Sequence, residues 1–171
     1  FLFQASNMGV ADYAFELGKD IGLVNNEVSN MLTIANIISI SGGILVYIIG
    51  TKYGRTAPLV VGISLSAIFT FLLHYSSNIS IYFLANTVTG IAWAFVIPYI
   101  LGLCASFDSH GQMAALAGFI SKVGLATGPL VGALLIIEYG FGLIINIASI
   151  ALAIAVVFIY ISSTKQREST E

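Results

Sequence analysis

Three ionisable side chains stand inside long apolar stretches of this sequence, where they could bind a proton, an ion or a charged solute. Lys122 lies within the uncharged surroundings of residues 113–137, and Asp12 and Glu16 lie near the end of the first stretch. A lysine near mid-membrane costs about 2.5–3.5 kcal/mol on insertion scales, so it normally faces a polar interior or a partner. We expect Lys122 to point to the bundle interior or a watery cavity, where it binds an anionic group or a carboxylate. The alternative is that it snorkels to the interface along its own stem.

Asp12 and Glu16 are four residues apart, a spacing that puts both carboxylates on one face of a helix. Glu16 is expected at the membrane interface and Asp12 about one turn deeper. A carboxylate at that depth favours its protonated form, which suits proton coupling. A solvated helix end explains both residues equally well.

Amide and aromatic side chains in the apolar stretches form a second group, one that could bind an uncharged solute. The candidates are Asn7, Asn36, Asn86, Trp93 and Tyr99. Such a lining holds a mostly apolar organic molecule through a few hydrogen bonds. Buried amides also tie helices together, and both aromatic residues fit ordinary packing inside a bundle.

The composition shows what kind of elements must position these residues. Of 171 residues, 58% are apolar and only 8% are charged, and the mean hydropathy is +0.99. Soluble domains carry about 25% charged residues, so the sequence indicates a membrane protein. A net charge of −2 without a basic face gives no sign of nucleic-acid binding. The single cysteine, Cys104, excludes an internal disulfide and a cysteine-based zinc cluster.

Six apolar stretches are long enough to cross a membrane, which takes about 20 residues as a helix. Their approximate ranges are 1–18, 28–49, 57–75, 79–105, 113–137 and 141–162. We therefore predict an all-α membrane protein in which residues 1–163 form one six-transmembrane-helix bundle. Residues 164–171 are expected to be a polar, disordered cytoplasmic tail. The chain starts inside an apolar stretch without a methionine or a charged signal-peptide region, so we expect it to be a fragment.

The positive residues in the loops predict the orientation. Four of them, Lys52, Arg55, Lys165 and Arg167, fall on the side of the membrane that holds the carboxy terminus, against Lys19 alone on the other side. Because cytoplasmic loops are enriched in lysine and arginine, this side is expected to be cytoplasmic. A cationic turn at Lys52 and Arg55 could serve topology alone.

The fifth stretch carries a seam of small residues. Gly124, Gly128 and Gly132 advance only about 40° per step around a helix, so they form a groove that another backbone can approach closely. Pro129 cannot donate to the carbonyl one turn back, and a bend is expected there, as at Pro98 in the fourth stretch. A groove with a bend favours a hinge, although such seams also occur as simple packing in membrane bundles.

The loop after the second stretch resembles a known family signature. The segment from Thr51 to Arg55, with Lys52 and Gly54, resembles the D-R-x-G-R core of the loop signature of the major facilitator superfamily. In that family the loop connects the second and third helices of each six-helix half. Only Gly54 and Arg55 agree outright, and Thr51 stands at the aspartate position. Carboxy-terminal halves of the family often carry such a worn copy.

Two further patterns support the resemblance. Gly124, Gly128, Pro129 and Gly132 reproduce the G-x-x-x-G-P-x-x-G spine of the family's fifth-helix signature, which helix eleven repeats. Asn86 and Gly90 keep the spacing of the Arg and Gly in the fourth-helix signature, with Asn in place of Arg. The resemblance implies one half, helices seven to twelve, of a twelve-helix major-facilitator fold. Its partner would be the amino-terminal six-helix half of the same protein.

The resemblance also implies a function. It predicts secondary active transport of a small organic solute by alternating access, coupled to a proton or ion gradient, in a bacterial inner membrane. Helices seven and ten would line the path, the helix with Pro129 would support the rocking motion, and Lys52, Gly54 and Arg55 would brace the cytoplasmic gate. No cofactor or metal is implied.

Other classes of function remain to be compared. A channel or a non-transporting membrane scaffold could be built from the same six helices. An intramembrane serine protease is excluded because the G-x-S-x-S segment and His74 lie on one stretch and His110 lies in a loop. The sequence has no H-E-x-x-H motif or acidic metal cluster, and we predict that the protein is not an enzyme.

Overall fold

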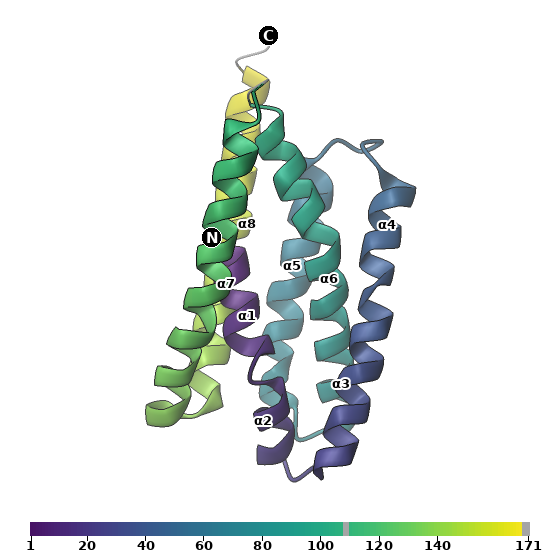
Figure 1. Ribbon diagram of the computed structural model, residues 1–171, viewed down its shortest axis with the longest axis vertical. Helices are drawn as coiled ribbons and strands as arrows, with labels where there is room; N and C mark the ends of the chain where they lie inside the picture. The colour runs from purple at the N-terminus through teal and green to yellow at the C-terminus, as the bar shows by residue number, and fades with distance from the viewer. Residues whose placement is uncertain (108–109, 169–171) are drawn as a thin grey trace.

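The computed structural model describes residues 1–107 and 110–168, and within these ranges every regular element is a helix. The elements are α1 (Leu2–Ala11), α2 (Ala14–Asp20), α3 (Asn25–Ser39), α4 (Ser41–Ile49), α5 (Thr56–Leu72), η1 (Leu73–Tyr75), α6 (Ile79–Ala105), α7 (Gln112–Tyr139) and α8 (Phe141–Glu168) (Figure 1). The expected all-helical membrane architecture is confirmed.

Five helical segments in the described part are long and apolar enough to cross a membrane. They are Asn25–Ile49, Thr56–Tyr75, Ile79–Ala105, Gln112–Tyr139 and Phe141–Ile161. Large apolar side chains cover much of their outer surface, and Tyr47 and Ile137 are 90% and 85% exposed. Such an apolar surface is unfavourable in water but is stable in contact with lipid tails.

The first stretch is not one continuous helix, contrary to the sequence-based prediction. α1 ends at Ala11 and α2 begins at Ala14, because the Tyr13 amide donates to the carbonyl of Val10 and not to that of Gly9 one full turn back. The Tyr13 hydroxyl then donates to the carbonyl of Pro129 in α7, at 2.7 Å. The bond from Tyr13 to α7 therefore fastens the chain at this break.

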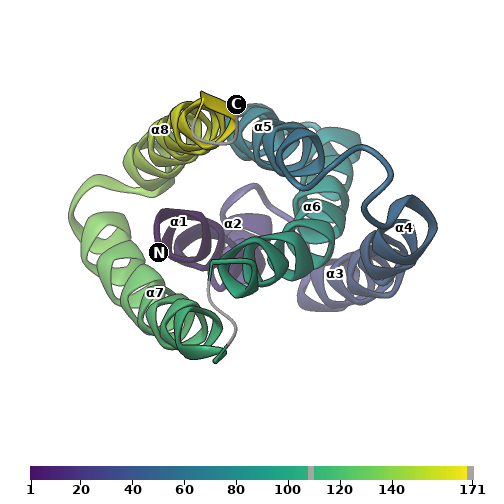
Figure 2. The ribbon, with the colours of Figure 1, turned by 90° about the horizontal axis from the view of Figure 1, so that it is seen from above.

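The helices form a bundle around α1. Seen from above, α1 lies between α7, α8, α5 and α6, and α3 and α4 pack on the outer side of α6 (Figure 2). The α4–α5 loop and the ends of α6 and α8 lie at one end of the molecule, and the α2–α3 and α7–α8 turns lie at the other (Figure 1). We call the first of these the loop end. It carries the residues that the charge count assigns to the cytoplasm.

The contact between α1 and α7 depends on the glycines of the small-residue seam. The buried residues of α7 are Gly124, Gly128 and Gly132. A Cβ atom on Gly128 would clash with the carbonyl oxygen of Ala5, and one on Gly132 would lie 2.6 Å from that of Gly9. The absence of side chains lets the α1 backbone lie directly on α7, and α7 runs through Pro129 without interruption.

Two other features differ in detail from the sequence-based ranges. The second span is divided at Ile40 into α3 and α4. At the carboxy terminus α8 continues to Glu168, so residues 164–168 of the expected disordered tail are helical, whereas residues 169–171 lie outside the described part. Lysine, glutamine, arginine and glutamate are good helix formers, which explains why the helix continues past its apolar part.

Candidate functional site

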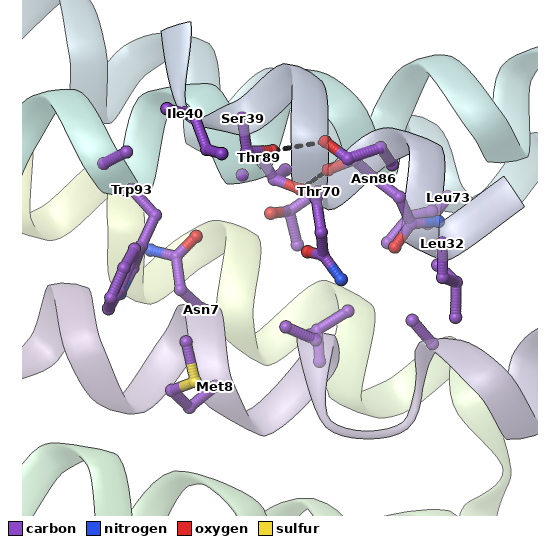
Figure 3. A pocket seen from close by; sticks show the side chains of 17 residues that line it. Asn7, Met8, Leu32, Ser39, Ile40, Thr70, Leu73, Asn86, Thr89 and Trp93 are labelled. Atoms are coloured by element: carbon purple, nitrogen blue, oxygen red, sulfur yellow. Dashed lines mark hydrogen bonds between the residues drawn. The ribbon is translucent and has the colours of Figure 1, made fainter. Parts of the chain in front are cut away.

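A cavity of about 370 Å³ opens between α1, α2, α3, α5 and α6. Asn7, Asn36 and Asn86 line it from α1, α3 and α6, and we call it the asparagine pocket. Figure 3 shows Trp93 at one end of the pocket and Leu32 and Leu73 at the other. Among its described lining residues none is ionisable. The pocket therefore offers amide, hydroxyl and indole groups on a mostly apolar wall.

The three asparagines have different surroundings. Asn7 is 5% exposed, its amide nitrogen donates to the Phe3 carbonyl at 2.8 Å, and its amide oxygen accepts from the Ser66 hydroxyl at 2.7 Å. Asn86 is half-buried and donates to the carbonyl of Tyr82 in its own helix, at 2.8 Å. Asn36 is exposed on the pocket wall. Asn7 thus ties α1 to α5, while Asn36 is the asparagine most open to a solute.

Trp93 belongs to a chain of hydrogen bonds across three helices. Its indole nitrogen donates to the amide oxygen of Gln4 at 2.6 Å, and the Gln4 amide nitrogen donates to the Ser121 hydroxyl at 2.9 Å. Gln4 and Ser121 were not among the residues predicted from the sequence. A usable signal was present, because Gln4 lies three residues before Asn7 and so shares its helix face.

Tyr99, a candidate for the lining with bundle packing as the alternative, does not line the asparagine pocket. It is 4% exposed, its ring lies 5.1 Å from that of Phe95, and its hydroxyl donates to the Gly50 carbonyl at 2.8 Å. Six residues along α6 correspond to about 240° and 9 Å, so Tyr99 points to another side, closer to the loop end. Its hydroxyl fastens α6 to the end of α4. Pro98, one residue earlier, is exposed within an unbroken α6.

The ionisable candidates lie outside the asparagine pocket. Lys122 is exposed on α7 and does not point to the interior of this bundle, one of the two sites expected for it. Asp12 and Glu16 are both exposed. They do not share one continuous helix as expected, because Asp12 caps the end of α1 and Glu16 lies in the first turn of α2. Asp12 directly follows Ala11, which lines the pocket.

The α4–α5 loop forms a tight turn at the loop end. Gly54 has a φ of +70°, a conformation that residues with a side chain rarely adopt. The ammonium group of Lys52 lies 5.5 Å from the centre of the Tyr53 ring. Arg55 is the N-cap residue of α5, and its Nε atom lies near Gly102 of α6. The loop that resembles the D-R-x-G-R signature thus connects α4 to α5 and lies against α6.

Comparison with known proteins gives one family. The model of the Major Facilitator Superfamily matches residues 1–171, the whole chain. No curated protein and no solved structure matches the chain. The match agrees with the helical bundle, the apolar outer surface and the position of the loop and glycine motifs. The chain belongs to the Major Facilitator Superfamily and is a multi-pass membrane protein of this transporter family.

Proposed function

We propose that the chain forms the carboxy-terminal half, helices seven to twelve, of a secondary transporter that moves a small organic solute by alternating access. The observation that carries this proposal is the asparagine pocket, whose described lining combines three amides and an indole without an ionisable group. The pocket opens on the bundle surface, so a second half can close the other side. Rocking of the two halves would expose the solute first to one face and then to the other.

The lining points to the chemical class of the solute. A mostly apolar wall with a few amide and hydroxyl groups suits an uncharged organic molecule, which is oriented by hydrogen bonds and held by apolar contact. A charged solute would lose its hydration without gaining an opposite charge in this half. Proton coupling is assigned to Asp12 and Glu16, because Asp12 adjoins the pocket wall at Ala11.

Lys122 is assigned to the boundary with the amino-terminal half. It is exposed on α7 near mid-span, where contact with lipid would be unfavourable. A carboxylate of the other half would offset that cost. The Lys52, Gly54 and Arg55 turn would brace the cytoplasmic gate, and the charge distribution supports a cytoplasmic carboxy terminus. The membrane that we propose is a bacterial inner membrane.

Trp93 is the only tryptophan of the chain, and its fluorescence provides the test. The purified transporter with both halves, in which Trp93 is kept as the single tryptophan, is titrated in lipid nanodiscs with uncharged and charged organic solutes. Uptake of each solute that binds is then measured in proteoliposomes with and without a proton gradient. We expect saturable quenching by an uncharged solute and weaker quenching in Asn36→Ala. A preference of the pocket for charged solutes, or uptake that never saturates, would contradict the proposal.

A further inference from the structure

A second cavity of about 270 Å³ lies closer to the loop end, between α1, α6 and α7. Its described lining is almost entirely apolar, with Gln4 and Ser121 among its few polar residues. We call it the apolar pocket. It faces the same helices α1 and α6 that contribute to the asparagine pocket.

The two pockets follow one another along the same pair of helices. On α6 the asparagine pocket ends at Trp93 and Ala94, and the apolar pocket begins at Ile97. On α1 the apolar pocket is lined up to Gln4 and the asparagine pocket begins at Asn7. On both helices, therefore, the lining of one pocket ends and that of the other begins at the same level of the bundle.

The hydrogen bond between Trp93 and Gln4 lies at this boundary. Trp93 lines the asparagine pocket, Gln4 lines the apolar pocket, and 2.6 Å separates the indole nitrogen from the amide oxygen. Gln4 is 4% exposed, and its amide nitrogen is held by Ser121 of α7. Both ends of the amide are engaged, so the orientation of the indole is set from α7 through Gln4.

We propose that Trp93, Gln4 and Ser121 form a partition between the two pockets, with Gln4 as the positioning residue that holds the indole closed. A solute that passes from the asparagine pocket toward the loop end must open the bond between Trp93 and Gln4. Movement of α7 against α1 and α6 would open it by drawing Ser121 away. The inference rests on the proposed function, because a partition matters only where a solute moves along these pockets.

Trp93 is the only tryptophan of this chain, and in a transporter whose other tryptophans are replaced by phenylalanine it allows a direct test without any solute. In Gln4→Leu the indole loses its acceptor, and we expect acrylamide to quench Trp93 more strongly, by about two- to tenfold, the range that corresponds to one net hydrogen bond. Ser149→Ala is the matched control. Ser149 is also buried, but its hydroxyl bonds only within α8, to the carbonyl of Ile145. Equal quenching in Gln4→Leu and Ser149→Ala would overturn the proposal.

Cys104 is the only cysteine of this chain, and in a transporter whose other cysteines are replaced by serine it provides a second measurement, from the other side of the partition. Cys104 lines the apolar pocket. A membrane-impermeant thiol reagent is added to the face opposite the loop end, in cells that carry the protein in its membrane. Opening the partition in Gln4→Ala should speed modification of Cys104 by about two- to tenfold. An unchanged rate would contradict the inference.

A milder variant covers the case in which Gln4 variants do not fold, as judged by circular dichroism. Ser121→Ala keeps the bond between Gln4 and Trp93 but releases the Gln4 amide nitrogen. We expect a smaller increase in quenching than in Gln4→Leu, and no increase would overturn the role of α7. Neither the quenching of Trp93 nor the modification of Cys104 needs a solute. A failure of uptake would therefore refute the proposed function, whereas the quenching and modification rates decide separately whether the partition exists.

Discussion

At the scale of single residues, Asn7 and Asn36 line one pocket but serve it differently. The Ser66 hydroxyl is completely buried and donates to Asn7, so Asn7→Ala leaves it without that acceptor. We expect a loss of about 1–3 kcal/mol in the free energy of unfolding. Asn36 is exposed, so Asn36→Ala should keep the stability and weaken solute binding. Thermal unfolding in nanodiscs and quenching of Trp93 measure the two effects, and equal stability of both variants would contradict the assignment.

Lys122 supports a second prediction at this scale. Because it is exposed and lines neither pocket, Lys122→Met should leave solute quenching of Trp93 unchanged. Insertion of α7 into the membrane should become more favourable by about 2.5–3.5 kcal/mol, the cost of a central lysine. Glycosylation-based insertion assays measure the second effect. A loss of solute binding would place Lys122 at the solute after all.

The sequence identified the amides and Trp93 of the pocket because polar groups in apolar stretches are few. It could not tell Tyr99 from Trp93, since both aromatic residues lie on one helix and only the packing of α4 shows that Tyr99 bonds to Gly50. Gln4 was missed for a related reason. Its importance comes from Trp93 and Ser121, which are 89 and 117 residues away in the chain.

At the scale of the elements, the contact between α1 and α7 is closest at Gly128, the middle glycine of the seam. Gly128→Ala would place a methyl group against the Ala5 backbone, so α1 must move away from α7. We expect a destabilisation of about 1–3 kcal/mol. Gly118→Ala on the same helix is the control, because no atom outside the adjoining turns of α7 lies within 4 Å of the added methyl group. Thermal unfolding decides, and equal stability of the two variants would refute the close contact.

The hydroxyl of Tyr13 has a separate effect on α7. Tyr13→Phe removes the bond to the Pro129 carbonyl and keeps the ring, which packs against Gly132. We expect a loss of about 0.5–1.5 kcal/mol in stability. Hydrogen exchange should increase around residues 12–14, at the break between α1 and α2. Unchanged exchange there would show that the break does not depend on this bond.

The glycine seam could be predicted from the sequence because three glycines at two identical four-residue spacings define one helix face. The division of the first apolar stretch into α1 and α2 could not be predicted from the sequence. Nothing in the local composition around Tyr13 requires a break, and its hydrogen-bond partner lies on α7. The last five spans predicted from hydropathy have bounds close to those of the five apolar helical segments, whereas the interruption of the first stretch depends on packing and appears only in three dimensions.

At the scale of the whole molecule, the loop end should be cytoplasmic. A cysteine introduced at Thr51, in a Cys104→Ser background, should react with an impermeant thiol reagent only after the membrane is opened. A cysteine at Asn26, in the turn region at the opposite end, is the matched control and should react in intact cells. The reverse pattern would invert the orientation and remove the basis for a cytoplasmic gate.

The central claim is that the asparagine pocket faces alternate sides of the membrane during transport. Asn36→Cys in a Cys104→Ser background tests it most directly, with impermeant thiol reagents applied from either face while the solute and the proton gradient are varied. The account predicts that conditions that raise reactivity from one face lower it from the other. Reactivity from both faces under one condition, rising and falling together, would indicate a channel and contradict the account.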